Sequence, residues 1–298
     1  MVYTMRIFLL TILCLVFSVF TNTAQSNLWT DIFENQFDNV GERYIVPEIY
    51  RTVKLNLSEA NTLLKDAPLE FSVEAIEDRY IIELPMPDGS FQVFKFWESS
   101  TMEPDLQIQY PEIRTYTGQG IDDPYATLKF DLTPHGFHAQ ILSPNGRVFI
   151  DPHNKGDIQH YISYYTKDFH KINAEFECQL FSDQNLIGEI GHPSNEPLTP
   201  SGPQLRTYRL AVAATGEYTA FHGGTVPLGL AAVVTSVNRV NGVYEKEVAV
   251  RMVLIANNNL IIYTNASTDP YSNTNGSAML GQNISNLSTV IGNSNFDI

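Results

Sequence analysis

The chain has 298 residues, of which 43% are hydrophobic and 17% charged, a balance typical of folded globular proteins and not of disordered chains. Its formal net charge is −15 and its Lys and Arg do not cluster, so no nucleic-acid partner is expected, because such partners are bound through clustered positive charge. Only two Cys are present, which excludes a structural zinc site built from several thiolates.

Residues 1–24 have the pattern of a signal peptide. A basic residue precedes an apolar run over 7–20, and small and polar residues follow up to Ala24. The run is short for a membrane span, so we expect cleavage near Ala24 and export to the medium or the cell surface. Cys14 would leave with this segment, and its lipidation is disfavoured because the large Leu13 precedes it. No later run is long enough to cross a membrane, so the processed chain is expected to have no membrane partner.

Residues 25–178 are predicted to form an antiparallel β-rich domain. Short stretches between 80 and 165 alternate at period two, and in Thr127–Leu132 three apolar side chains face one way and three polar ones the other, as in a half-buried strand. A helix with Ser58 as its N-cap is predicted within Leu55–Leu64. Hairpin turns are predicted where Pro and Gly are two residues apart, at Pro87–Gly89, Pro134–Gly136 and Pro144–Gly146.

The histidines of this domain allow two interpretations. His135 and His138 are three residues apart across a turn and a strand, so divergent side chains are favoured over a metal-binding pair. His153, Asp157 and His160 lie in a polar stretch that could hold a divalent ion. Nothing in the sequence fixes their geometry, and a solvated loop is the favoured interpretation.

Two adjacent acidic residues also allow two interpretations. Asp122 and Asp123 follow the glycines of Gly118–Gly120 and precede Pro124. Adjacent carboxylates could form a catalytic pair or part of a calcium loop. Before a Pro they more often form a turn, which is the interpretation we favour.

Residues 179–204 are predicted to be a linker that contains a processing region. Periodicity fades here, and four prolines accumulate among Ser, Asn, Gly and acidic residues: Pro193, Pro197, Pro200 and Pro203. This composition is typical of linkers, where proteases cut. A domain boundary is therefore expected near Leu205.

Residues 205–298 alternate between strand and helix patterns. Thr207–Ala213 and Ala249–Ala256 are apolar strand candidates, and a Gly-rich loop between them leads to a helix with Thr225 as N-cap and Pro227 in its first turn. The apolar positions of this helix repeat at three and four residues, at Leu230, Val233, Val234, Val237, Val240 and Tyr244. A strand, helix, strand unit of this length implies parallel pairing through a right-handed crossover.

The remaining residues suggest more of the same sheet. Ile261–Tyr263 is a further strand candidate, Phe296 and Ile298 look like the opening of another strand, and Ser277 is a helix N-cap candidate. The helix stripe after it consists of Leu280, Ile284, Leu287 and Ile291. Because this sheet is expected to be incomplete, the segment alone should aggregate or depend on a partner. The predicted fold class is α+β: an antiparallel β-rich domain followed by an incomplete α/β sheet-and-helix domain.

Two groups of sequence strings resemble a known family. The second half resembles the start of the reprolysin-like metallopeptidase domain of secreted Bacteroidetes-type proteins at Thr207–Ala211, Ala214–Tyr218, Asn238–Asn241 and Arg251–Ile255. The first half resembles the propeptide of those precursors at Met102–Pro104, Tyr110–Tyr116 and Gly118–Pro124. The resemblance covers nearly the whole chain after the signal peptide. It implies a propeptide at 25–178 and a zincin-like fold at 205–298.

The resemblance further implies a metzincin active site. Such a site holds zinc through three His of a HExxHxxGxxH motif, whose Glu is the general base toward the zinc-bound water. The motif is absent from these 298 residues, since no His is followed by Glu and no two His are four apart. No catalytic residue is therefore assigned. Zinc and protein or peptide substrates are expected only in the complete enzyme, and this chain is expected to be inactive alone because it ends before the zinc site.

Three residues are candidate metal contacts by comparison with the family. Related propeptides often supply a Cys thiolate to the zinc, and Cys178 lies where such an inhibitory cysteine-switch ligand would be; the alternative is a small buried hydrophobe. Glu217 and Glu245 lie near the ends of predicted elements, where calcium could bridge strand and helix as in some metzincins. Ordinary surface charge is the favoured interpretation of both.

Two hypotheses about function result. In the first, the chain belongs to a secreted zinc metalloendopeptidase precursor whose propeptide contacts the catalytic domain. In the second, it is a non-catalytic exported protein whose β-rich region binds a protein or glycan and whose 205–298 segment is a degenerate peptidase remnant. The first accounts for the order of all the predicted segments, and the second for the missing zinc motif.

Overall fold

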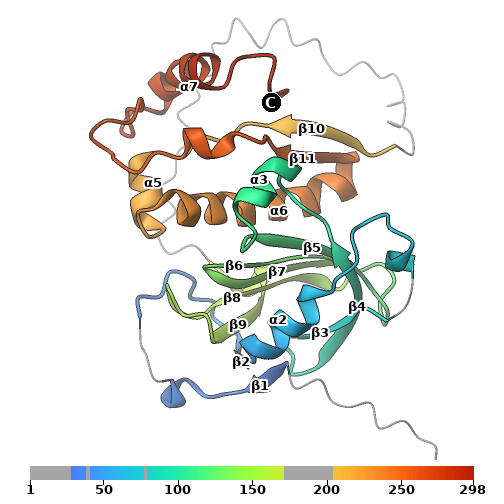
Figure 1. Ribbon diagram of the computed structural model, residues 1–298. Helices are drawn as coiled ribbons and strands as arrows, with labels where there is room; N and C mark the ends of the chain where they lie inside the picture. The colour runs from blue at the N-terminus through green and yellow to red at the C-terminus, as the bar shows by residue number, and fades with distance from the viewer. Residues whose placement is uncertain (1–27, 38–40, 77–78, 171–203) are drawn as a thin grey trace, which may run out of the picture.

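A computed structural model of the chain describes residues 28–37, 41–76, 79–170 and 204–298. The predicted signal peptide, the predicted linker and Cys178 lie outside these residues. Figure 1 shows the described part as stacked layers: a large curved sheet below, helix α6 across it, and a small sheet on the other side of α6. No helix among the described residues is long and apolar enough to cross a membrane. We call residues 28–170 the first region and residues 204–298 the second region.

The first region is built on a nine-stranded antiparallel sheet with the order β1-β2-β9-β8-β7-β6-β5-β4-β3. The predicted alternation over 80–165 is confirmed by seven of these strands. The strands are β1 (Trp29–Asp31), β2 (Arg51–Leu55), β3 (Ile81–Pro85), β4 (Phe91–Glu98), β5 (Arg114–Gly120), β6 (Thr127–Thr133), β7 (Gly136–Ser143), β8 (Gly146–Pro152) and β9 (His160–Tyr165).

The three predicted hairpin turns are also confirmed. They join β3 to β4, β6 to β7 and β7 to β8, and each places its Gly at positive φ: +92° at Gly89, +98° at Gly136 and +133° at Gly146. Residues with a Cβ rarely adopt such angles, which is why Gly stands at these positions.

The sheet curls until its two ends approach each other. Ser163 of β9 donates its hydroxyl to the carbonyl of Pro85 in β3 at 2.7 Å. Arg51 of β2 donates to the carbonyl of Ser90, in the turn after β3, at 2.7 Å. The concave face encloses the main apolar core, whose largest fully buried side chains include Phe94, Phe96, Tyr116, Phe130, Phe137 and Tyr161.

Short helices complete the first region. Helix α2 (Leu57–Lys65) covers one opening of the curved sheet through Ala60 and Leu64. Its N-cap is Asn56, whose side chain accepts from the backbone of Glu59 at 3.2 Å, so the prediction of Ser58 as N-cap is wrong. The other helices are α3 (Pro104–Gln109), which was not predicted, and the 3-10 turns η1 (Glu34–Gln36), η2 (Glu74–Ile76) and η3 (Thr166–Asp168).

The second region begins with a parallel strand, helix, strand unit, as predicted. β10 (Arg206–Leu210) pairs with β11 (Val250–Leu254), and the 23-residue α6 (Val226–Val248) connects them. Thr225 is the N-cap of α6 and Pro227 lies in its first turn, which confirms both predictions. The loop predicted before Thr225 instead contains a short helix, α5 (Gly216–Phe221), capped by Thr215.

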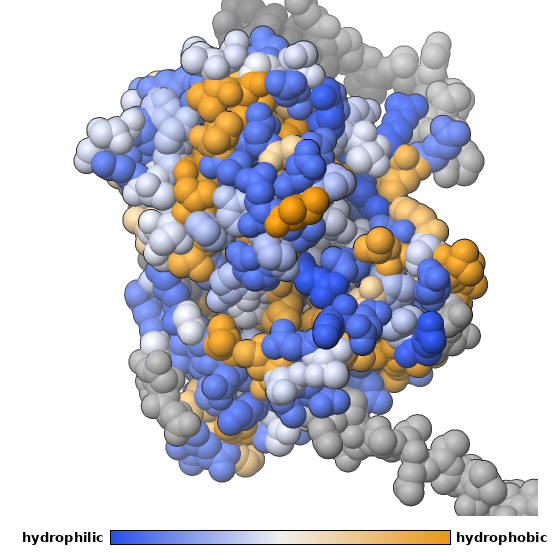
Figure 2. All heavy atoms as spheres, viewed as in Figure 1, coloured by the Kyte–Doolittle hydropathy of each residue, from blue (hydrophilic) through white to orange (hydrophobic). Residues whose placement is uncertain are grey.

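The later elements depart further from the predictions. The candidate strand Ile261–Tyr263 forms only an isolated parallel bridge from Ala214 to Ile262, after the 3-10 turn η4 (Asn258–Ile261). Helix α7 (Gly276–Val290) is capped by Asn275, so the prediction of Ser277 is wrong. Its predicted stripe is only half buried. Leu287 and Ile291 pack inward, whereas Leu280 and Ile284 are exposed. Figure 2 shows hydrophobic residues at the surface, among hydrophilic ones, in the upper part of the molecule.

The residues before Ile298 run along β10 as the sequence suggested. The backbone of Asp297 donates to the carbonyl of Arg209 at 2.9 Å, and the carbonyl of Ile298 accepts from Ala211 at 3.0 Å. This segment is not a regular strand, but it lies beside β10 on the edge opposite β11. The order across this small sheet is therefore β11, β10, and then residues 297–298.

Candidate functional site at the contact between the two regions

Helix α6 lies against the convex face of the large sheet, over β5, β6 and β7. The prediction that β6 is buried on one face only is therefore wrong. Lys129 and Asp131, on the face predicted to meet solvent, are 6% and 1% exposed. Because charged side chains are costly to bury without partners, the contact must supply partners for both.

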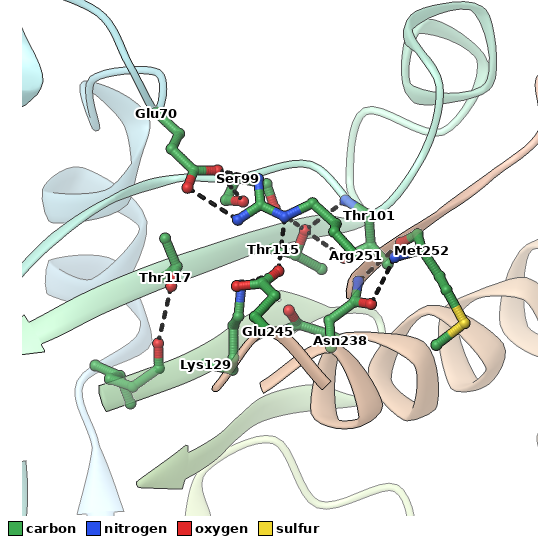
Figure 3. A network of polar contacts seen from close by, with 12 residues as sticks. Glu70, Ser99, Thr101, Thr115, Thr117, Lys129, Asn238, Glu245, Arg251 and Met252 are labelled. Carbon is green, nitrogen blue, oxygen red and sulfur yellow. Dashed lines mark hydrogen bonds and ion pairs between the residues drawn. The ribbon is translucent and has the colours of Figure 1, made fainter. Parts of the chain in front are cut away.

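Lys129 belongs to a four-residue ionic network that joins the two regions (Figure 3). Arg251 of β11 donates to both carboxylate oxygens of Glu70 at 2.6 and 2.9 Å, and its Nε donates to Glu245 of α6 at 2.6 Å. Lys129 Nζ lies 2.9 Å from the other carboxylate oxygen of Glu245. Two cations and two carboxylates make the network neutral, so each buried charge is balanced.

The network shifts the proton affinities of its members. Burial acts to raise the pKa of Glu70, but hydrogen bonds from Arg251 and Ser99 outweigh it, and the pKa lies below its ordinary value. Burial lowers the pKa of Lys129, and the charge of Glu245 opposes that shift. The pKa of Arg251 is raised despite its burial because it hydrogen-bonds to both Glu70 and Glu245. The Glu70 carboxylate is therefore held ionised within the contact.

A second set of polar contacts lies further along α6. Asp131 accepts from the hydroxyl of Thr235 at 3.0 Å, and Asn238 donates to the backbone carbonyl of Phe130 at 3.0 Å. Arg239 of α6 pairs with the buried Asp151 of β8 at 2.5 Å. Specific partners along the whole helix fix its register on the sheet.

Gly242 allows the helix and the sheet to approach each other closely. A Cβ at this position would lie 2.6 Å from Oε1 of Gln140 and 3.0 Å from Cγ of Lys129. No side chain fits there without moving its neighbours. The sequence indicated no reason for a Gly in the middle of this helix, and the structure supplies one.

The two regions also share an apolar core. Met102, Leu106 and Ile113 of the first region pack in one buried cluster with residues of the second region that include Leu230 and Leu254. The backbone takes part as well, because the amide of Leu254 donates to Thr101 at 2.8 Å and its carbonyl accepts from Glu103 at 2.8 Å. Residues 101–103 thus cover the outer edge of β11, which would otherwise be open to other strands.

The four histidines that the sequence analysis considered as metal ligands each contact a different residue. His138 contacts Asp131 at 3.0 Å, and His135 donates from Nε2 to the carbonyl of Leu228 at 2.8 Å. His153 contacts Glu34 at 2.9 Å and His160 contacts Asp157 at 2.8 Å. Each of these four histidines therefore has its own protein partner. The stretch from His153 to His160 is not simply a solvated loop, since both histidines are buried.

The adjacent acidic residues form a turn, as favoured. Asp123 accepts from the backbone of Tyr125 at 3.0 Å and from the hydroxyl of Ser143 at 2.7 Å. Asp122 accepts from the backbone of Val93 at 3.2 Å. These bonds bind neighbouring loops together, and the hydrogen bonds lower the pKa of Asp123.

The two candidate calcium contacts lie apart. Glu217 is exposed on α5, which agrees with surface charge, whereas Glu245 is largely buried in the ionic network, so the surface interpretation is wrong for it. Within the described residues no group of three or more His, Cys, Asp or Glu side chains is arranged to hold a metal ion. The described residues therefore do not fit a zinc site. Cys178 lies outside them and stays a prediction.

Sequence reasoning missed most residues of the contact. Glu70 carried no recognisable motif. Arg251 and Asn241 stood in strings that carried the family resemblance, but these strings indicated no contact, and Asn241 exchanges two 2.8 Å hydrogen bonds with the backbone of Met252. One signal was available: Asn238 and Asn241 interrupt the apolar side of a long helix at helical spacing. Polar residues there indicate that the helix packs against something polar.

The second region matches a known family. Residues 204–298 match a family model described as metallo-peptidase family M12B, reprolysin-like. This match supports a metallopeptidase-type function for the second region, and the family is zinc-dependent. No curated protein matches the chain.

Proposed function

We propose that this chain is part of a secreted zinc metalloendopeptidase precursor. In this proposal the first region is the propeptide, and the second region contributes the opening strands and helices of a zincin-like catalytic domain. The observation that carries the proposal is the contact itself. A region that matches the reprolysin-like family is joined to the β-rich region through a shared apolar core and a buried, charge-balanced network.

The geometry supports the role of an intramolecular scaffold for the first region. Its sheet covers the polar side of α6, where Thr235, Asn238 and Glu245 have partners on β6. Residues in and around α3 pack in the apolar cluster with α6 and β11, and residues 101–103 cover the edge of β11. Ion pairs across the contact tie α6 and β11 to one arrangement. An incomplete parallel sheet exposes apolar faces and unpaired edges, and these contacts remove both problems.

The chemistry of the complete enzyme would come from outside the described residues. Zinc, when bound, would activate a water for peptide-bond hydrolysis. Residues 1–24 would direct export, and Cys178 would be the residue available for a cysteine switch, a role tested by activity of Cys178→Ala before any processing. Calcium remains a candidate structural ion of the complete enzyme.

The function is tested by zinc content and casein cleavage of the product of the complete reading frame. Both are measured before and after the first region is released at a protease site inserted between residues 185 and 200. The proposal predicts one zinc per chain and cleavage that increases after release. Neither zinc nor cleavage in either form would contradict it, and would favour the exported, non-catalytic binding protein.

A further inference from the structure

A cavity of about 610 Å3 lies where the first region meets the start of α6. Its apolar wall comes from both regions: Tyr44 and Ile45 from the first, and Tyr218, Phe221 and Leu228 from the second. Small-molecule sites typically measure roughly 300–1,000 Å3 and are lined mainly by apolar and aromatic side chains with a few polar groups. The cavity has the size and lining of a ligand site.

The carboxylates near this cavity already have partners. Asp151, which lines it, is buried and accepts from Arg239 and from the hydroxyl of Tyr164 at 2.9 Å. Glu34 pairs with His153 and with Arg43. Glu42 accepts from the hydroxyl of Tyr44 at 2.5 Å. Each of these acidic groups therefore already has at least one hydrogen-bond or ion-pair partner in the protein.

The cationic side chains at the cavity, in contrast, can still bind an anionic group. Lys155 is exposed at the cavity, and its Nζ lies 3.8 Å from the ring centre of Phe221 and 5.5 Å from that of Tyr44. Within the part of the chain that the structure describes, Lys155 has no ion pair. Nε of Arg239 is buried without a hydrogen-bond partner. Unpaired donors beside an apolar wall favour a ligand that is both apolar and anionic.

The neutral groups of the cavity fit the same ligand. Burial lowers the pKa of His135 and, together with the nearby charges, lowers the pKa of His222 to about 4. At neutral pH both rings are therefore uncharged. They add to the aromatic wall, with His222 ring centres 4.5 Å from Tyr218 and 4.9 Å from Phe221. The charge of Arg239 is balanced by Asp151, so the positive charge available to a ligand is that of Lys155.

We propose that this cavity binds a small molecule that has an apolar body and one carboxylate group. The carboxylate pairs with Nζ of Lys155, and the body packs against Tyr218, Phe221 and Leu228. Both a fatty acid and the C-terminal residue of a peptide with an apolar side chain have this chemistry. The site exists only while the two regions are in contact, so binding stabilises their association by mass action. This inference stands independently of peptidase activity.

The test is calorimetric titration of the full chain with three probes: decanoate, N-acetyl-leucylphenylalanine with a free carboxylate, and the same dipeptide as its amide. The variant is Lys155→Met, which keeps the apolar stem. The control is Lys167→Met, because Lys167 also lies over an aromatic ring, that of Tyr165, at 5.2 Å but does not line the cavity. Thermal unfolding of both variants checks that they remain folded.

One equivalent of decanoate or of the free-acid dipeptide should bind, and whichever binds more tightly identifies the source of the ligand. Lys155→Met should weaken binding about five- to tenfold, the size expected when one charge-assisted contact is lost, whereas Lys167→Met should leave it unchanged. Binding of neither acid at millimolar concentration would overturn the proposal. So would equal binding of acid and amide, or an equal effect of the two variants.

Discussion

Arg251 of β11 and Glu70 of the first region are 181 residues apart in the chain and form a two-bond ion pair at 2.6 and 2.9 Å. Both side chains are largely buried, at 12% and 14% exposed. Breaking such a pair leaves an unpaired carboxylate in a desolvated site, which costs more than the loss of an exposed pair. The stability of the second region therefore depends on a residue of the first.

Arg251→Met tests this dependence. It leaves Glu70 without its cation and removes one partner of Glu245, so we expect the free energy of unfolding to fall by about 3 kcal/mol. The measurement is urea denaturation followed by circular dichroism. The matched control is Arg209→Met in the neighbouring β10, whose ion pair with Asp297 is exposed. Equal losses in the two variants would show that burial of the Arg251 pair is not what matters.

The apolar part of the contact is tested on α3. Leu106 is fully buried in the shared core, whereas Ile108 in the same helix is 76% exposed. Leu106→Ala should lower the free energy of unfolding by about 2–5 kcal/mol, the usual cost of a cavity in a core. Ile108→Ala should change it little. If both variants unfold at the same urea concentration as the native chain, α3 does not pack as described.

Close approach of helix and sheet is tested at Gly242. Gly242→Val places methyl groups against Gln140 and Lys129 and should destabilise the chain by about 1–3 kcal/mol through overpacking. Gly281→Val on α7 is the control, because nothing lies within 4 Å of a Cβ there. Valine favours helix over glycine, so Gly281→Val should be neutral or slightly stabilising. Thermal unfolding distinguishes the two, and a neutral Gly242→Val would contradict the packing.

The pH dependence of stability has a definite sign at His222. Its pKa is lowered by burial from 6.5 to about 4, so between these values the unfolded chain binds a proton that the folded chain does not. The contribution of neutral His222 to the free energy of unfolding is therefore fully present above pH 6.5 and is lost as the pH falls toward 4. His222→Phe keeps an aromatic ring and cannot titrate.

Urea denaturation at pH 7.5, 5.5 and 4.5 measures this effect. The native chain should lose more stability than His222→Phe over this range, because the other titrating groups are common to both. Parallel pH profiles for the two proteins would exclude His222 as a contributor.

Periodicity and turn chemistry predicted most of the fold, because these signals are local. Each signal concerns residues that are close together in the sequence. Examples are the alternation around Thr127–Leu132, the Pro and Gly of the turns, and the cap at Thr225. Neighbouring caps were harder to choose, since Asn56 and Ser58 both have suitable side chains, and the structure has Asn56 as the N-cap.

The contact between the regions could not be predicted in the same way. From the sequence, the polar face of β6 was expected to meet solvent. Alternation at period two shows which residues share a face of the strand, but it does not show what covers that face. Lys129 and Glu245 are 116 residues apart, and only the folded chain brings them together. The zinc motif was correctly found to be absent from the sequence, and the family match to residues 204–298 agrees with the resemblance.

The central claim is that the first region is a bound partner of the peptidase-like second region, held by buried contacts and not only by the connecting chain. It is tested most directly by cutting the full chain at a specific protease site inserted between residues 185 and 200, followed by gel filtration and thermal unfolding. We expect the two pieces to elute together and to unfold in one transition, and Arg251→Met to weaken their association. Separate elution of two folded pieces from the native sequence would contradict it.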